Sequence, residues 1–496
     1  NVACENLIFN LKEKMYNKFL NIDIRCLNDY STGDLIQRSS SDIETVRKLF
    51  STQLVNAFGS IATIILVIIV MSLINLKLAM ISISLCIVIS FLSYVFYGKI
   101  GKIFKETDEA ESQLMVFIKE ALFNIRVIKA FNREDYILKL FREKSEEFNI
   151  TQNKFMKTFA KFRAVNDFLT FLQLAIIIVV GGYETISGRM NFGDLIAFVI
   201  YINMIIWPIR QMGQLLSDMA KASVSISRIY EVLDLPEEDY EYGIRDVSFS
   251  EKIEFKNVSL VINDNKVLDN ISFVINACES LGVIGSTGSG KSMIVYLLLG
   301  LFEATSGEIL IDGINIKEIN KRYLREKISA IMQESELFNM SILENVKITN
   351  DKIDDKSIFN ATKVSSIHDE ILNFSSKYET IVIDNGGNLS GGQKQRISIA
   401  RGLLKPFEVL ILDDSLSAVD MNTDLKINNA LKSMDKKFTS IFISHRISTI
   451  TNCDNIIVMD EGKIVESGKH NDLIMKNGIY SKINEIQSKE YDVSNE

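Results

Sequence analysis

Eight consecutive residues carry the clearest chemical signal in this sequence. They are Gly285, Ser286, Thr287, Gly288, Ser289, Gly290, Lys291 and Ser292. This GxxxxGK[ST] pattern lies between a strand-like apolar run at 281–284 and a helix-like run at 293–299. Its glycines permit a loop whose backbone N–H groups converge on phosphate oxygens, and the helix directs its positive end at the same charge. We expect Lys291 to reach the phosphates and the Ser292 hydroxyl to bind Mg²⁺. A glycine-rich turn that binds nothing is the alternative, and the strand–loop–helix setting disfavours it.

Two adjacent carboxylates supply the second signal. Asp413 and Asp414 follow the apolar run 409–412, which is typical of a buried strand. An acid at that place beside a P-loop holds Mg²⁺ through its waters, and Asp413 fits this role. Asp414 is placed to polarise an attacking water. Two acids after a strand are otherwise a helix N-cap or a turn, but the P-loop upstream favours the metal role.

The segment that must position these residues has the pattern of a soluble α/β domain. From about residue 251 to residue 489, short apolar runs and alternating strand patterns are bounded by turn residues. An acidic linker at 234–250 precedes this domain, and a short tail at 490–496 follows it.

The first 233 residues have a different character. They contain four apolar runs, at about 54–75, 78–96, 168–187 and 194–212. Each is close to the roughly 20 residues that a helix needs to cross a bilayer. Four such helices in a soluble protein would need a very large core, so we expect an all-α transmembrane helical bundle over 1–233.

The four runs form two pairs with short links, near Lys77 and at 188–191. The long stretch 98–167 between the pairs is rich in Lys and Arg, which predicts a cytoplasmic location for it and for both chain ends. Gln173, Glu184 and Asn203 are polar groups near or within the runs. They either face a pathway or make contacts between helices and at the interface.

Composition excludes several classes. Hydrophobic residues make up 47% of the chain, which fits a protein partly in lipid and partly in water. A net charge of −8 argues against a nucleic-acid partner. The five cysteines are scattered without a metal-ligand spacing, so we interpret them as reduced and incidental.

The second half resembles the ATP-binding cassette (ABC) family in four further motifs. Residues 389–396 look like its signature motif, Gln333 like its Q-loop, Ser417–Asp420 like its D-loop and Ser444–Arg446 like its switch-histidine motif. The signature residues are Ser390, Gly391, Gly392 and Gln393.

This resemblance implies roles for particular residues. The P-loop, Ile262, the signature residues and Asp420 would contact ATP, and Mg²⁺ would be held by Ser292, Gln333 and Asp413. Gln333, Asp414 and His445 would be catalytic. The implied fold is a membrane domain followed by an α/β P-loop cassette, and the implied activity is ATP hydrolysis coupled to transport.

The first half resembles the exporter branch of the family. Residues 32–42 and 124–134 look like its two intracellular loops, whose short helices seat on the cassettes. Simple amphipathic helices are the alternative for both stretches. Exporter halves usually have six membrane helices and this chain shows four, which favours a fragment over a natively short chain.

Two departures from the family pattern concern the ATP site. Asp414 stands where competent members carry Glu, which withdraws the acid by one methylene, and Ile262 stands where an aromatic residue stacks on adenine. In the family, Asp at this position is typical of one subunit of heterodimeric exporters. We therefore expect a slow ATP site here and a second, different half-transporter as partner.

Several alternatives stay open. A homodimeric exporter, a regulatory subunit that does not pump and a nucleotide-gated channel all fit the motifs, whereas a soluble cassette ATPase would lack the four apolar runs. The family exports drugs, lipids, peptides and siderophores, and nothing in the sequence chooses among them, although multidrug or lipid-like export is our leading expectation. A bacterial plasma membrane fits the Ile-, Lys- and Asn-rich composition.

Overall fold

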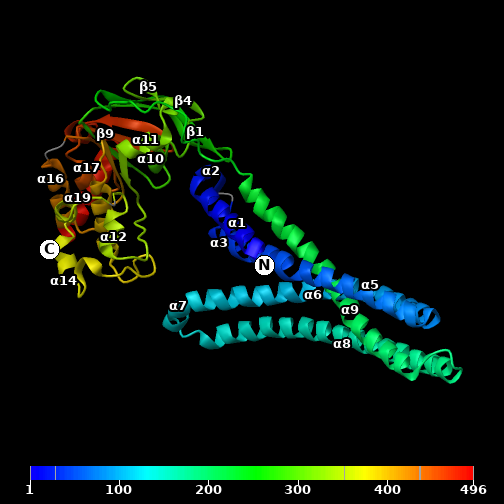
Figure 1. Cartoon of the computed structure of the whole chain (residues 1–496). Coiled ribbons are helices and arrows are strands. Elements are labelled where there is room, and N and C mark those ends of the chain that lie inside the picture. Colours follow the sequence, from blue (N-terminus) through cyan, green and yellow to red (C-terminus); the bar gives the residue numbers. More distant parts are fainter. Residues whose placement is uncertain (1, 28–29, 351, 435–436, 495–496) are drawn as a thin grey trace. The chain divides into compact units, whose positions relative to one another are not determined.

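The computed structural model describes residues 2–27, 30–350, 352–434 and 437–494. The chain divides into two compact units. Asn1–Asn21 and Tyr30–Leu235 form the first, and Ile22–Asp29 and Pro236–Glu496 form the second. Figure 1 shows long helices in the first unit and sheets with short helices in the second.

The described part of the first unit is helical. Its elements are α1 (Val2–Asn21), α3 (Thr32–Gln37), η1 (Arg38–Asp42), α4 (Ile43–Lys48), η2 (Leu49–Gln53), α5 (Leu54–Ile74), α6 (Leu76–Phe123), α7 (Ile125–Ala130), α8 (Glu134–Ile186) and α9 (Phe192–Leu233). The segments η1 and η2 are π-helical turns that continue directly into their neighbours. Asn75 separates α5 from α6 and caps the first turn of α6 by accepting a hydrogen bond from the Leu78 N–H at 3.1 Å. The link between α5 and α6 is therefore tighter than expected, and Lys77 lies inside α6.

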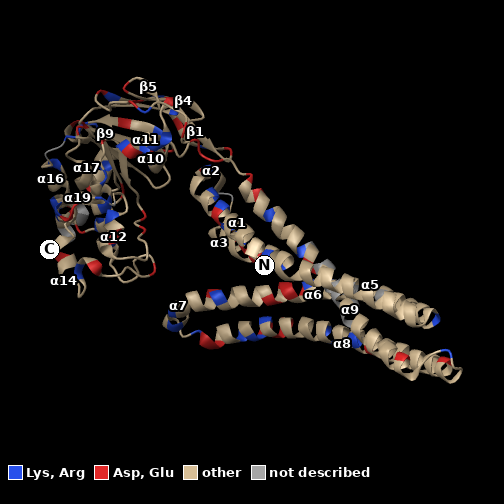
Figure 2. Ribbon diagram, viewed as in Figure 1, with Lys and Arg blue, Asp and Glu red and all other residues tan. Residues whose placement is uncertain are grey.

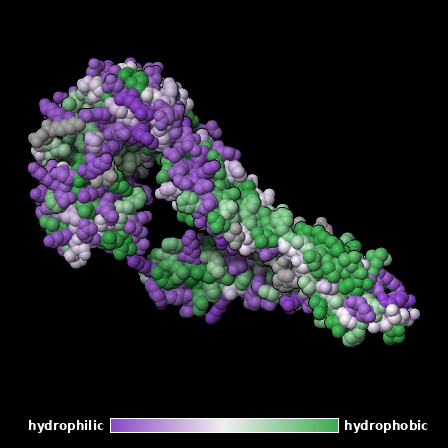
Figure 3. Space-filling view, in the orientation of Figure 1, coloured by the Kyte–Doolittle hydropathy of each residue, from purple (hydrophilic) through white to green (hydrophobic). Residues whose placement is uncertain are grey.

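The predicted apolar runs lie on α5, α6, α8 and α9. Among the described residues, two helical stretches are long and apolar enough to cross a membrane, Thr32–Ile74 and Glu134–Ile186, and shorter apolar helices cover Leu76–Ile89 and Phe192–Ile206. Only 17% and 22% of the apolar windows of the two long stretches are buried. Figure 3 shows hydrophobic side chains gathered on the surface over these parts of the helices. Such exposure is what a lipid-facing surface requires and a soluble core helix lacks.

One buried cluster joins these four helices. It comprises Val67, Met71, Leu78, Ala79, Ile177, Met190, Phe198, Ile202 and Ile205. Gln173 of α8 donates from Nε2 to the Ser82 backbone oxygen and hydroxyl of α6, each at 3.3 Å. Asn203 donates to the Val199 carbonyl of its own helix at 2.8 Å. The contacts of Gln173 favour the helix-packing interpretation of that residue.

Glu184 lies near the end of α8 that joins α9. Its carboxylate is 3% exposed and pairs with Lys77 at 2.8 Å and with Arg189 at 2.5 Å. The two cations come from the two short links of the sequence analysis, so this buried acid ties the two helix pairs together at one end of the unit.

The long helices α6 and α8 form an antiparallel pair joined by α7. With 53 residues at 1.5 Å each, α8 is about 80 Å long, far more than the roughly 30 Å of a bilayer core. Figure 2 shows Lys, Arg, Asp and Glu along the parts of both helices nearest α7, whereas the body of α5 carries none. The ion pair between Lys154 and Glu106 at 2.7 Å connects the charged parts.

The described part of the second unit contains two sheets. The first has the order β2-β1-β4-β5 and is antiparallel; the second has the order β10-β9-β3-β8-β7-β6 and is parallel except for β10. The strands are β1 (Lys252–Ile262), β2 (Asn265–Asn276), β3 (Ser280–Gly285), β4 (Ser306–Ile311), β5 (Ile314–Asn315), β6 (Ile328–Ile331), β7 (Val409–Asp413), β8 (Thr439–Ile443), β9 (Asn455–Asp460) and β10 (Lys463–Gly468).

Short helices surround these sheets. They are α2 (Ile24–Leu27), α10 (Lys291–Leu298), η3 (Ile316–Glu318), α11 (Lys321–Lys327), α12 (Ile342–Lys347), α13 (Asp355–Val364), α14 (His368–Asn373), η4 (Lys377–Glu379), α15 (Gly391–Leu404), α16 (Met421–Lys432), α17 (Ile447–Ile450), α18 (His470–Met475) and α19 (Ile479–Ser494). A separate buried cluster, which includes Val346, Ile358, Ile371, Tyr378 and Ile397, gives the helices α12 to α15 a core of their own.

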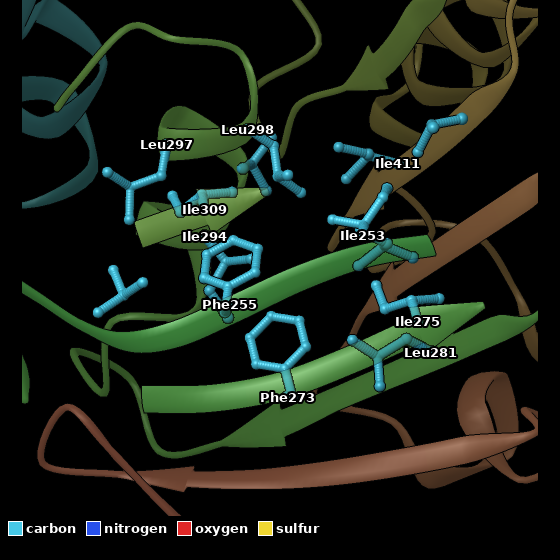
Figure 4. Close-up of a cluster of buried hydrophobic side chains, with 14 of the residues drawn as sticks. Ile253, Phe255, Phe273, Ile275, Leu281, Ile294, Leu297, Leu298, Ile309 and Ile411 are labelled. Carbon is cyan, nitrogen blue, oxygen red and sulfur yellow. The ribbon is translucent and has the colours of Figure 1, made fainter. Parts of the chain in front are cut away.

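The main core of this unit lies between the two sheets and α10. Figure 4 shows Phe255 of β1 beside Phe273 of β2, with Ile294 of α10 and Ile411 of β7 in the same cluster. The two phenylalanines are opposite each other in the strand register, and their ring centroids are 4.4 Å apart. Buried β-branched and aromatic side chains on paired strands explain why the alternating pattern from residue 251 onward folds into sheets.

The predicted linker begins with a buried ion pair. Arg325 donates to both oxygens of Glu238 at 2.6 and 2.7 Å, and the Tyr240 hydroxyl donates to the same carboxylate at 2.7 Å. Glu238 is 5% exposed. Burial raises the pKa of Glu238, but the bonds from Arg325 and Tyr240 outweigh burial and leave that pKa below its usual value.

We expect Glu238→Ala to lower the thermal unfolding midpoint of the purified chain, since it leaves the Arg325 guanidinium without its carboxylate, at a cost of about 3 kcal/mol. The control is Glu241→Ala in the same linker, whose side chain is 93% exposed. Because the pKa of Glu238 is lowered on folding, its stabilisation is complete above the usual pKa of about 4.3 and is lost as pH falls through the lowered value. Equal midpoints for the two variants at pH 7 would contradict this account.

Candidate functional site

The residues that the sequence marks for phosphate chemistry meet at one edge of the second sheet. Parallel pairing of β3, β8, β7 and β6 brings their carboxyl ends to the same side. The P-loop follows β3, Asp413 ends β7, the switch loop Ser444–Arg446 follows β8, and Gln333 comes shortly after β6. This edge is where α/β sheets bind ligands.

The P-loop has the backbone that its glycines permit. Gly288 and Gly290 have φ of +82° and +90°, and a Cβ on Gly290 would lie 2.9 Å from the Val267 carbonyl oxygen. The Lys291 ammonium is 2.9 Å from the Gly285 carbonyl oxygen and 2.7 Å from that of Ser286, and it donates to both. Burial lowers the pKa of Lys291, and the nearby carboxylates of Asp413 and Asp414 partly offset this effect. The lysine is thus held inside the loop that would surround a phosphate.

The residues expected to hold Mg²⁺ line one cavity. Its volume is about 590 Å³, and Ser292, Gln333 and Asp413 are among its lining residues. Asp413 is 2% exposed. Burial raises its pKa, a hydrogen bond from the Ser292 hydroxyl lowers it, and the charge of Asp414 raises it further. A hydroxyl, an amide and a carboxylate are the oxygen donors that Mg²⁺ takes when phosphates and water supply the rest, so the set fits the ion.

Asp414 has an unusual backbone. Its φ is +46°, in the left-handed region, and its N–H donates to the Ile443 carbonyl of β8 at 2.8 Å. That bond fixes the Cα of Asp414 against the neighbouring strand. With the Cα held there, an aspartate carries its carboxylate less far from the main chain than a glutamate would.

The signature residues begin helix α15. Ser390 is the N-cap, and its hydroxyl accepts from the Gln393 N–H at 3.2 Å while the Gln393 side chain accepts from the Ser390 N–H at 2.9 Å. A Cβ on Gly392 would lie 2.9 Å from the Ala418 carbonyl oxygen of the D-loop, Ser417–Asp420. The signature residues therefore pack against the D-loop. They do not line the cavity that contains Ser292 and Asp413.

Glu370 of α14 supports the same helix and was not predicted. It accepts from Arg396 at 2.6 Å and from the Gln393 side chain at 3.0 Å. Arg396 also donates to the carbonyl oxygens of Gly392 and Ser366. Because Glu370 lies 20 residues upstream of Ser390 in a stretch without a motif, local patterns do not reveal this contact.

Asp420 and Ile262 lie at the ends of secondary-structure elements. Asp420 is the N-cap of α16 and accepts from the Thr423 N–H at 2.9 Å, which lowers its pKa. Ile262 ends β1, pairs with Asn265 across the hairpin and packs in part against the main core. Its exposed part is apolar, as contact with a purine requires.

A segment of the N-terminal half lies within the second unit and was also missed. Asp23 donates from its backbone to the Pro236 carbonyl at 3.2 Å, and Arg25 lies 3.9 Å from Glu303. Ile24 lines the same cavity as Ser292. This segment precedes residues 32–42. Within the first unit, Arg38 of that stretch pairs with Asp34 and with Glu231 of α9 at 3.0 and 2.8 Å.

Comparisons with known proteins identify both halves. The family model described as the ABC transporter transmembrane region matches residues 1–209, and the ABC transporter model matches residues 268–417. YgaD of Bacillus subtilis strain 168, a candidate multidrug export ATP-binding/permease protein, is 32% identical over 490 residues, which cover 98% of this chain and 84% of YgaD.

Further similarity comes from a second relative and from a solved structure. A similarly named protein of Staphylococcus aureus strain N315 is 32% identical over 97% of this chain and 84% of its own length. The structure of a bacterial Atm1-family ABC exporter with ATP bound matches with a TM-score of 0.85 at 23% identity, over 98% of this chain and 86% of that one. The predicted fold, a helical membrane domain followed by a P-loop cassette, is confirmed. The chain belongs to the ABC transporter family, as a half-transporter with fused membrane and ATPase domains.

Proposed function

We propose that this chain is one subunit of an ATP-driven exporter whose own ATP site hydrolyses slowly. Its runs at about 54–75, 78–96, 168–187 and 194–212 would cross the membrane, and the cassette at 251–489 would lie in the cytoplasm. The exposed apolar surface of α5 and α8 supports this placement. A bacterial plasma membrane fits the organisms of the relatives.

In this proposal, ATP binds across a dimer of cassettes. Lys291 and the P-loop hold the phosphates, Ile262 packs on the adenine, and Ser292, Gln333 and Asp413 hold Mg²⁺, which would neutralise phosphate charge. Gln333 and His445 would orient the attacking water and the terminal phosphate. The exposed Ser390 and Gly391, with Gly392, Gln393 and Asp420, would complete the ATP site of the second subunit.

The proposal of slow hydrolysis rests mainly on the backbone of Asp414, which is held in place by a hydrogen bond. Because its N–H is bonded to the Ile443 carbonyl, the main chain cannot move forward to compensate for the shorter side chain. The carboxylate therefore stays about 1 Å short of the place that a glutamate would reach, and such a displacement costs about 100-fold in rate. This chain would thus combine a slow ATP site at its own P-loop with an intact signature helix. That combination favours a heterodimer over a homodimer or a regulatory subunit.

The names of the relatives bear on the substrate. Two that cover nearly all of this chain are described as candidate multidrug export proteins. We extend this description to the present chain and propose drug-like or lipid-like molecules as its substrates.

The test is the native mass of the subunit, purified in detergent from cells that also carry its neighbouring genes. We expect a complex of this chain with one different half-transporter. A pure homodimer would contradict the heterodimer and would require Asp414 to serve in both ATP sites.

A further inference from the structure

The last helix of the cassette is attached to the switch loop, Ser444–Arg446. Gln487 of α19 donates from its amide to the His445 carbonyl oxygen at 2.7 Å and accepts from the Ile447 N–H at 2.9 Å. An amide side chain both donates and accepts, so it can hold two backbone groups on either side of Arg446. Helix α19 thereby holds the backbone on both sides of Arg446, including the carbonyl group of His445.

The same loop is fixed from the opposite direction by its own arginine. The Arg446 guanidinium donates to the carbonyl oxygens of Val419 and Ser417 in the D-loop, each at 2.7 Å. Its backbone N–H donates to the Ser444 hydroxyl at 2.9 Å. Movement of His445 relative to the D-loop would break these bonds.

The D-loop is in turn attached to the signature helix. Gln395 of α15 accepts from the Ala418 N–H at 2.9 Å and donates to the Ser417 hydroxyl at 3.1 Å. Gln395 is 5% exposed. A continuous set of contacts therefore runs from the signature helix through the D-loop and the switch loop to α19.

Helix α19 has a rigid base for this task. Tyr480 in its first turn is fully buried, and its hydroxyl lies 2.7 Å from His470 Nδ1. Gln487 follows Tyr480 by seven residues, which places both side chains on the same face of the helix. The buried tyrosine sets the position of α19, and Gln487 transmits that position to the loop.

We infer that Gln487 is a positioning residue for His445, and that the C-terminal helix is thus part of the ATPase machinery. Both bonds restrain the main chain from residue 445 to residue 447, and this restraint limits the positions that the imidazole can take relative to the phosphate site. This inference rests on the role proposed for His445, but it does not depend on whether the partner is the same chain or a different one.

Two variants separate positioning from packing. Gln487→Ala removes both bonds, whereas Gln487→Glu keeps the volume and the acceptor but loses the donor and turns a carboxylate oxygen toward the His445 carbonyl. The control is Ser488→Ala, the exposed neighbour whose hydroxyl bonds only within its own helix. If Gln487 acted only by filling space, the glutamate would restore function.

The experiment is hydrogen–deuterium exchange on the full complex with MgATP, together with single-turnover hydrolysis. We expect both Gln487 variants to speed exchange in the 444–448 segment and to slow hydrolysis at this chain's own ATP site, each by about 10-fold, with ATP affinity unchanged. Unchanged exchange, faster exchange throughout the sheet, or full rescue by the glutamate would overturn the inference. A different result would refute the proposed role of His445 rather than that of Gln487. In it, the Gln487 variants would speed local exchange, but neither they nor His445→Ala would change the hydrolysis rate.

Discussion

Lys291→Ala should weaken ATP binding at this chain's own P-loop by about 100-fold, because the charge-assisted bonds of one ammonium to phosphate are worth roughly 3 kcal/mol. The ammonium already lies inside the loop, within 2.9 Å of two backbone carbonyls, and needs only a small movement to reach a ligand. Equilibrium binding of labelled ATP to the purified complex measures the effect. The number of ATP molecules bound should fall by one for each copy of this chain.

The matched control is Lys256→Ala on β1, whose ammonium is half exposed and pairs only at the surface with Glu254. It should leave ATP binding unchanged. Retention of full ATP stoichiometry by Lys291→Ala would show that the P-loop of this chain does not hold the phosphates.

Asp414→Glu should raise the hydrolysis rate at this chain's own site by about 100-fold, since it restores the reach of the carboxylate by about 1 Å. The left-handed backbone and the bond to Ile443 hold the Cα in place, so we expect the added methylene to lengthen the side chain rather than to shift the main chain. Single-turnover hydrolysis measures the change as conversion of the slow phase into a fast one.

The companion variant Asp413→Glu tests the specificity of this effect. Asp413 is buried at the end of β7, where an added methylene displaces the metal-binding carboxylate, so its rate should fall. No acceleration in Asp414→Glu would show that a factor other than carboxylate reach limits this site.

Much of the site could be predicted because its residues are close together in the sequence. The P-loop, Asp413 with Asp414, and the signature residues are each continuous motifs in which a strand or helix end sets the geometry. The parallel order of β3, β8, β7 and β6 then brings the first two of these segments to one sheet edge, whereas the signature residues begin helix α15. That strand order was not predicted, because it depends on how distant segments pair rather than on a local pattern.

The supporting contacts could not be predicted, since they join distant residues without a local pattern. Gln487 reaches a loop 40 residues upstream, and Arg325 reaches Glu238 across 87 residues. The segment at Asp23 and Arg25 was missed because no motif distinguishes it from the helix before it. The pair between Arg38 and Glu231 in the helical unit likewise joins residues 193 positions apart.

The two half-sites of this chain should be unequal, slow at its P-loop and competent at its signature motif. The most direct measurement compares the steady-state ATPase rates of Ser390→Ala and Asp414→Asn in the same purified complex. We expect a large loss in Ser390→Ala, because the partner's fast site loses the group that completes it, and a rate near that of the unchanged complex in Asp414→Asn. Equal, large losses in both variants would show that the two half-sites are equivalent.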